Sequence, residues 1–206
     1  MRYYLNHFSV LIISLFFCFY SNANMTLDEL FFDDSKSFHL KIIESIPEIG
    51  IVQMGPKDAE NTIIEFMDYF CGYCKKIHPE LIKLVEERDD TRVVFIQHPI
   101  LSQSSKVIAA MVVAANKQGK GLELHNKLFS IEGSLNQQKL DKIFQEINLN
   151  TVKLGIDIST DEINNIVKLS SFLANGAGAR GTPTLFVNEE FFGGYVPLER
   201  IKSLLR

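Results

Sequence analysis

The chain has 206 residues, of which 46% are hydrophobic and 22% are charged, the composition of a folded globular protein rather than of a disordered or collagen-like one. Its 21 Lys and Arg residues and 25 Asp and Glu residues give a net charge of −4, which disfavours a nucleic-acid binder because it offers no positive surface to phosphate groups. Three cysteines are too few for a scaffold held together by disulfides.

Residues 1–23 have the order of a secretory signal peptide. Arg2 precedes an apolar run from about Phe8 to Tyr20, and a short stretch of small and polar residues ends at Ala23. The run spans roughly 20 Å as a helix, less than the roughly 30 Å of a bilayer core, so a permanent membrane anchor is the weaker alternative. We expect cleavage after Ala23, export to the periplasm, and loss of Cys18 with the signal peptide.

Helix and strand patterns alternate in the first part of the mature chain. An N-terminal helical segment is expected at 24–50, with a helix from Thr26 to about Ser45. Apolar residues at helical spacing after Cys71 predict a further helix that begins at the carboxyl end of a strand. The strands around it, predicted from β-branched and aromatic residues, are at 51–54, 62–67 and 92–97.

Only helical patterns follow Pro99 until residue 184. Ser159 and Glu162 form a capping box that predicts the start of a fourth helix in this stretch, ending at Gly176. The first three helices are expected around 107–115, 124–131 and 140–147. Two strands, at 184–187 and 190–192, and a last helix opened by Pro197 complete the pattern. The chain therefore reads as an α/β unit interrupted by a helical insertion.

Two cysteines, Cys71 and Cys74, remain in the mature chain, separated by Gly72 and Tyr73. A disulfide between them closes too small a loop to stabilise the fold much, so a structural role explains them poorly. A helix N-terminus stabilises a thiolate, which is the species that attacks a disulfide. We therefore expect Cys71 to attack and Cys74, one turn later, to resolve the mixed disulfide, a reaction that needs no cofactor.

The resolving thiol must lose a proton while buried, so a nearby acid is expected. Glu65 is the candidate, because it lies in an apolar strand six residues before Cys71. The alternative is that Glu65 points to solvent from an edge strand. Asp68 is a rival acid, but it follows the strand and is expected to be exposed.

A second candidate loop, Gly181-Thr182-Pro183-Thr184, comes directly before a predicted strand. A trans proline in a turn is the more frequent arrangement. A cis Thr182-Pro183 bond would instead leave the backbone groups of Thr182 free to pair with an extended substrate chain. The residues alone leave both alternatives open.

Metal binding is the competing chemistry at the cysteines. Cys71, Cys74 and His78 are three possible ligands for zinc or copper, as in a metal-binding chaperone. No fourth ligand is evident, and His98 and His125 each stand alone in the sequence. We therefore predict no metal.

Two segments of the chain resemble a known superfamily. Residues 70–79, with Pro79 five positions after Cys74, resemble the active-site helix of the thioredoxin superfamily, and Gly181-Thr182-Pro183-Thr184 resembles its cis-proline loop. With Glu65 and the helical insertion, the stretch from Gly50 to Arg206 is similar to the DsbA-type oxidoreductases. The resemblance implies a thioredoxin fold at 51–101 and 181–206 with a helical domain inserted at 102–180. It also implies these site residues: Cys71 as nucleophile, Cys74 as resolving thiol, Glu65 as buried acid, Pro183 in cis, and Gly72, Tyr73 and Thr182 in contact with substrate.

The resemblance implies a periplasmic thiol-disulfide oxidoreductase that acts on exported cysteine-containing proteins and is recycled by a membrane partner of the DsbB or DsbD type. Gly72-Tyr73 departs from the Pro-His dipeptide of the strongest oxidants and resembles the exported isomerases, so a less oxidising disulfide is expected, with Lys75 and Lys76 in partial compensation. An isomerase or reductase kept reduced by a membrane donor is the alternative. Residues 24–50 are too few for a dimerisation domain, which predicts a monomer.

Overall fold

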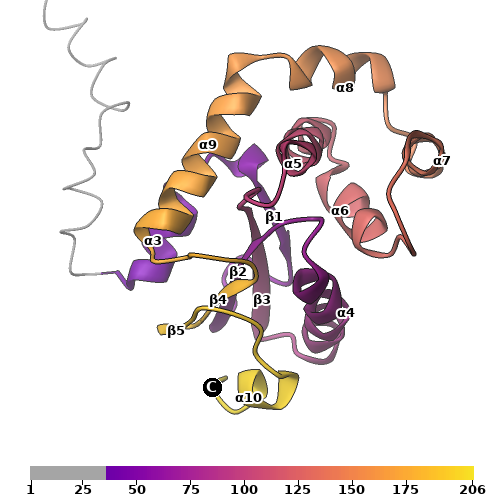
Figure 1. Ribbon diagram of the computed structural model, residues 1–206. Helices are drawn as coiled ribbons and strands as arrows, with labels where there is room; N and C mark the ends of the chain where they lie inside the picture. Colours follow the sequence, from indigo (N-terminus) through magenta and orange to yellow (C-terminus); the bar gives the residue numbers. More distant parts are fainter. Residues whose placement is uncertain (1–35) are drawn as a thin grey trace, which may run out of the picture.

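Five segments rich in β-branched and aromatic residues form one mixed sheet in the computed structural model, which describes residues 36–206 (Figure 1). The strand order is β1-β3-β2-β4-β5, with β2 and β3 parallel and the other neighbouring pairs antiparallel. The predicted strands are confirmed, and β2 and β3 begin one residue earlier than expected. Their bounds are β1 (Ile51–Met54), β2 (Asn61–Met67), β3 (Thr91–Gln97), β4 (Thr184–Val187) and β5 (Glu190–Phe192).

Helices cover both faces of the sheet. Helix α4 (Gly72–Glu87) links β2 to β3 and packs on one face, beside the short C-terminal α10 (Leu198–Lys202). Helices α3 (Phe38–Glu44) and α9 (Asp161–Gly176) pack on the other face (Figure 1). The sheet is therefore buried on both sides, and the two apolar clusters that hold it contain different strand residues.

Side-chain alternation along β2 decides what faces α4. Ile64 and Phe66 pack towards α3 and α9, while Ile63 and Met67 pack towards α4. Because successive side chains of a strand point to opposite faces, Glu65 lies on the α4 side, in the same row as Ile63 and Met67. β2 lies between β3 and β4, so this carboxyl is directed into the interior.

The chain between β3 and β4 is helical in the described structure, as the sequence predicts, but one helix was not expected. The helices are α5 (Gln103–Asn116), α6 (Gly121–Phe129), α7 (Gln137–Glu146), α8 (Thr151–Ile158) and α9. Helix α8 exposes Val152 and Ile156 and therefore shows no one-sided apolar stripe in the sequence. Ser159 is the C-cap residue of α8, so the predicted capping box of Ser159 and Glu162 is wrong. Thr160 caps α9 instead, because its side chain accepts a hydrogen bond from the N–H of Ile163.

Part of the predicted N-terminal region lies outside the described residues. The signal peptide at 1–23 and the start of the expected helix at Thr26 both fall there. Within the expected segment, α3 ends at Glu44 and is followed by a short 3₁₀ turn, η1 (Glu48–Gly50). In residues 36–206, no helix combines the length and the apolar character needed to cross a membrane.

The turn between β4 and β5 is tied to β2 and to the C-terminus through asparagine side chains. Asn188 has φ of 52°, and its buried side chain accepts a hydrogen bond from the N–H of Thr62 at 2.9 Å. The Asn188 amide also donates to Asn61, which accepts from the N–H of Arg206. These bonds join three segments that lie far apart in the sequence.

We expect Asn188→Ala to lower the free energy of unfolding by about 2 kcal/mol more than Asn148→Ala, measured by urea denaturation, because only the first leaves buried partners unsatisfied. Asn148 is a matched control, since it is exposed and has φ of 53°. Equal losses in the two variants would show that the loss of stability comes from the left-handed backbone conformation and not from the buried hydrogen bonds.

Candidate active site

The cysteine motif lies where β2 ends and α4 begins. Cys71, expected as the first residue of the helix, is its N-cap, and α4 begins one residue later, at Gly72. Its N–H donates to the carbonyl of Asp68 at 3.0 Å, and its carbonyl accepts from the N–H of Lys75 at 3.0 Å. Both cysteines are free thiols; Cys71 is 8% exposed and Cys74 is fully buried. A substrate sulfur can therefore reach only the first of them.

Hydrogen bonds at the helix start favour the thiolate of Cys71. The hydrogen bond from the Cys74 thiol makes the largest contribution, and Thr182 and the N–H groups of Cys74 and Tyr73 add to it. Together they outweigh the effect of partial burial and lower the pKa of Cys71 to about 5. The expected help from Lys75 and Lys76 is not among these causes. Lys75 Nζ donates to the carbonyl of Ile131, and Lys76 Nζ lies 4.1 Å from the centre of the Tyr195 ring.

Cys74 and Glu65 form a buried pair of acids. Burial raises the pKa of Cys74, and hydrogen bonding to Cys71 and the nearby Glu65 carboxyl raise it further. Burial likewise raises the pKa of Glu65 to about 8, with the Cys74 thiol opposing the shift. In the described residues no N–H or O–H group donates to either Glu65 oxygen. The alternative of a solvent-facing Glu65 is thus wrong, and the carboxyl is placed to exchange a proton with Cys74.

Asp68 is not the exposed residue that its position after β2 suggests. It is 1% exposed, and its carboxylate accepts hydrogen bonds from the N–H groups of Phe70 at 2.9 Å and Leu101 at 3.0 Å. The carboxylate therefore fastens the loop after β3 to the loop that carries Cys71. Two backbone donors hold its oxygens, in contrast to those of Glu65.

The second candidate loop lies directly against Cys71. The Thr182-Pro183 peptide bond is cis, and Pro183 is buried. The thiol of Cys71 donates to the carbonyl of Thr182 at 3.0 Å. The structure thus brings Glu65, Cys74, Cys71 and Thr182 into contact, and Gly72 and Tyr73 are exposed directly after Cys71 in the chain.

A polar and aromatic cluster behind the site was missed by sequence reasoning. The Tyr69 hydroxyl and His125 Nδ1 are 2.8 Å apart, and Gln97 donates to the same hydroxyl at 3.2 Å. The His78 ring lies 4.8 Å from the His125 ring and stacks on Phe129 at 4.5 Å. The position of His125 in the sequence suggests an isolated histidine, but in the structure it contacts Tyr69 and His78. Because the residues come from separate elements, no local spacing reveals the cluster.

Metal ligands do not converge at the cysteines. Within residues 36–206, no group of three or more His, Cys, Asp or Glu side chains is placed to hold a metal ion. The His78 ring packs against Phe129 and Phe95.

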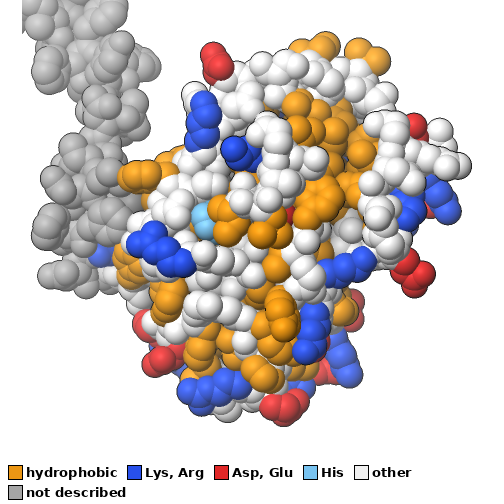
Figure 2. All heavy atoms as spheres, viewed as in Figure 1, with side chains coloured by type: hydrophobic (Ala, Val, Ile, Leu, Met, Phe, Trp, Pro, Cys, Tyr) orange, Lys and Arg blue, Asp and Glu red, His pale blue; other side chains and the backbone are white. Residues whose placement is uncertain are grey.

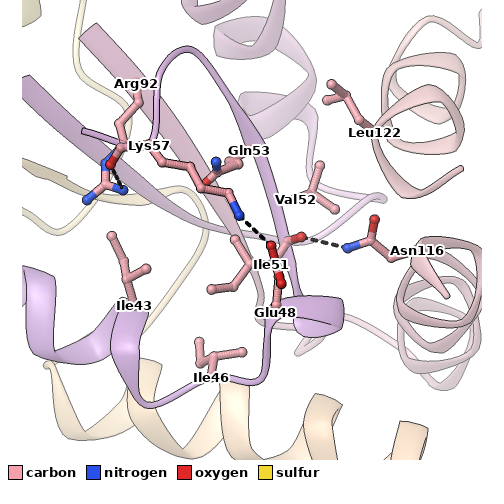
Figure 3. A pocket seen from close by; sticks show the side chains of 10 residues that line it. All are labelled: Ile43, Ile46, Glu48, Ile51, Val52, Gln53, Lys57, Arg92, Asn116 and Leu122. Carbon is pink, nitrogen blue, oxygen red and sulfur yellow. Dashed lines mark hydrogen bonds and ion pairs between the residues drawn. The ribbon is translucent and has the colours of Figure 1, made fainter. Parts of the chain in front are cut away.

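Two pockets differ in what they offer. One of about 280 Å³ adjoins Cys71 and is walled by Phe70, Leu128 and Leu135. Another of about 410 Å³ lies between α3 and β1, away from the cysteines (Figure 3). An ion pair between Glu48 and Lys57 crosses its mouth, and no nucleophilic thiol lines it. Only the first pocket is placed to receive a substrate group during chemistry at Cys71.

A family model and a solved structure both identify thioredoxin-like proteins as similar to this chain. A family model described as thioredoxin matches residues 48–206. The structure of a thioredoxin-like oxidoreductase from Silicibacter pomeroyi superimposes with a TM-score of 0.70 and 29% identity, covering 75% of this chain and 90% of that one. Disulfide bond formation protein D of Bacillus subtilis is 25% identical over 166 residues, 74% of each chain.

Other curated relatives are much longer. The Na(+)/H(+) antiporter NhaA 1 of Salinispora arenicola is 25% identical over 153 residues, which are 72% of this chain and 23% of the antiporter. The chain thus spans about a quarter of the length of the first curated relatives that it matches.

We expect the reduced protein to show one thiolate transition near pH 5, followed by its ultraviolet absorbance, because the pKa of Cys71 is lowered to about 5. Cys71→Ser should abolish the transition, and Cys74→Ala should move it to higher pH by removing the strongest hydrogen bond to the thiolate. A transition in Cys71→Ser equal to that of the wild type would contradict the assignment.

The pKa of His78 predicts acid sensitivity of the fold. Burial lowers that pKa from 6.5 to about 4, so the unfolded chain binds the proton first as the pH falls. The contribution of neutral His78 to the free energy of unfolding is fully present above pH 6.5 and is lost progressively as the pH falls towards 4. Between pH 7 and 5, the free energy of unfolding should fall by about 2 kcal/mol more in the wild type than in His78→Gln. Parallel pH profiles would show that His78 is not the source.

Proposed function

We propose that this chain, which belongs to the thioredoxin family and has a DsbA-like fold, is a thiol-disulfide oxidoreductase. The predicted fold class is confirmed by the family match and by the shared structure. The observation that carries the function is the contrast between the two thiols: Cys71 lies at a helix start with a pKa of about 5, and Cys74 is buried with a raised pKa. Because of this contrast, Cys71 leaves readily as a thiolate, whereas Cys74 is strongly disfavoured as a thiolate.

The proposed reaction transfers a disulfide in two exchanges. A substrate thiolate attacks Cys71 Sγ of the Cys71-Cys74 disulfide, a new S–S bond forms, and the bond to Cys74 breaks. A second substrate thiolate then attacks the substrate sulfur of this mixed disulfide and releases Cys71 as a thiolate. Two substrate thiols are oxidised to a disulfide, and the protein disulfide is reduced to the dithiol form that the structure shows.

Glu65 donates a proton to the buried Cys74 sulfur, or accepts one from it, during the exchange. A Cys74 thiolate is strongly disfavoured in the interior, and Glu65 is the buried acid beside it. With its pKa raised to about 8, Glu65 is largely protonated at neutral pH and gives its proton to Cys74 as the disulfide opens. In the reverse direction, the carboxylate takes that proton back.

Substrate is held beside Cys71 by the loop around Pro183 and by the start of α4. The carbonyl of Thr182 lies 3.0 Å from Cys71 Sγ, within reach of a chain bound to that sulfur. Tyr73 is 60% exposed and lies with Gly72 at the rim. These contacts favour an extended polypeptide as substrate.

The setting that we propose is the periplasm, supported by the signal-peptide pattern of residues 1–23. Exported proteins with cysteines are the substrates, and a membrane redox protein of the DsbB or DsbD type recycles a monomeric enzyme. A light-scattering mass near twice that of the chain would contradict the monomer. An isomerase or reductase is the second candidate, because neither Gly72 nor Tyr73 places a cation beside the thiolate.

We expect Cys74→Ala to accumulate mixed disulfides with cysteine-containing substrates, seen as mass shifts that reductant removes, because no resolving thiol remains. Cys71→Ser should form none and should lose activity. If Cys74→Ala traps no substrate while Cys71 is alkylated normally, the proposed exchange does not occur.

The reduction potential of the Cys71-Cys74 pair separates the two roles. A value near −120 mV in glutathione buffers indicates a disulfide donor, and a value of about −200 mV or lower indicates an isomerase or reductase. The absence of any reversible two-electron transition would overturn both.

A further inference from the structure

A groove between α5 and α9 stands apart from the site described above. It has a volume of about 540 Å³, and Pro99, Val167 and Phe172 provide its apolar surface. Phe172 is 53% exposed, so much of its ring is available for apolar contact with a partner. Lys106 of α5 and Lys168 of α9 also line the groove and bring a positive charge from each wall.

The charge of these walls departs from that of the whole chain. Neither residues 91–122 nor residues 163–188 contain an Asp or Glu, although the chain has 25 acidic residues and a net charge of −4. The first stretch includes α5, and the second includes most of α9 and the loop that holds Pro183. The groove is therefore a cationic surface on an acidic protein.

Lys106 and Lys168 lack the acidic partners that several lysines on other helices have. Lys83 pairs with Glu87 and Lys142 pairs with Glu146, each one helical turn away. No acidic residue lies three or four positions from Lys106 or Lys168. Neither forms an ion pair with any residue of the described range 36–206. Both charges are exposed and available to a partner.

Both walls of the groove are connected to the Cys71 site through short loops. Pro99 lines it, and two residues later the N–H of Leu101 is bound by Asp68, which also binds the N–H of Phe70 beside Cys71. On the other wall, α9 ends at Gly176, and the chain reaches Thr182 six residues later. In the view of Figure 2, hydrophobic side chains lie across the centre of the molecule, and Lys, Arg, Asp and Glu side chains lie mostly towards its edges.

We propose that this groove docks an acidic segment of the polypeptide whose cysteine reacts at Cys71. Glutamate or aspartate side chains pair with Lys106 and Lys168, and an apolar side chain next to them covers Phe172. The inference rests on the proposed oxidoreductase function and names a preferred class of substrate or redox partner, one with acidic residues near its cysteine in sequence.

The test uses single-cysteine peptides with the oxidised full-length protein. One peptide has a glutamate tract before the cysteine and another has it after; glutamine replaces glutamate in their controls. The rate at which each peptide reduces the Cys71-Cys74 disulfide is followed by alkylation of the released thiols. At low salt, at least one glutamate peptide should react about tenfold faster than its glutamine control, and high salt should remove the difference.

Lysine variants locate the effect. Lys106→Glu and Lys168→Glu should each lower the glutamate-to-glutamine rate ratio about threefold. Lys153→Glu is the matched control, because Lys153 is an exposed lysine on α8 with no ion pair in the described residues, and it should leave the ratio unchanged. Thermal unfolding of each variant checks that the fold is intact.

The outcomes distinguish the docking surface from the chemistry. Equal rates for glutamate and glutamine peptides, or a preference that survives in both groove variants, would overturn the docking surface and leave the exchange reaction standing. If neither the peptides nor glutathione reduce the disulfide, the proposed function fails and the docking surface with it.

Discussion

The burial of the Glu65 carboxyl beside the Cys74 thiol is the constraint on which the site depends. β2 is an interior strand, and alternation directs Glu65 to the face that α4 covers. No N–H or O–H group of the described residues satisfies the carboxylate there, so its ionised form is strongly unfavourable. Cys74 is under the same penalty. The pair is therefore most stable holding protons, and opening or closing the disulfide requires one of them to move.

Asp68 shows how the same chain treats a buried acid whose oxygens have hydrogen-bond donors. It lies three residues after Glu65 and is almost as deeply buried, yet two backbone N–H groups solvate its oxygens. A carboxylate held by charge-assisted hydrogen bonds in this way ties two loops together. The difference between the two acids comes from the donors around them and not from burial, which is nearly equal.

Local patterns predicted most of this fold, because alternation and helical spacing are imposed by backbone geometry. The strands, the helix after Cys71 and the helices α5, α6, α7 and α9 follow from such patterns. Glu65 was also within reach, since a carboxyl in an apolar strand is unusual. Asp68 and His125 were misjudged because their surroundings come from distant segments, namely the loop at Leu101 and the ring of Tyr69. Helix α8 was missed because two of its apolar side chains, Val152 and Ile156, face solvent.

The helical insertion does more than cover the sheet. Helix α9 packs on the side of the sheet opposite α4, with Leu173 and Ala174 in the apolar cluster there, and its end leads directly into the loop that contacts Cys71. A surface formed by α5 and α9 is therefore positioned by the same core that positions the thiol. Helix-borne side chains on a packed core keep a fixed geometry, so a charge pattern on them discriminates among polypeptides without altering the sulfur chemistry. The absence of acidic residues from the stretches that build this surface is readable in the sequence, but its meaning depends on the fold that brings the two stretches side by side.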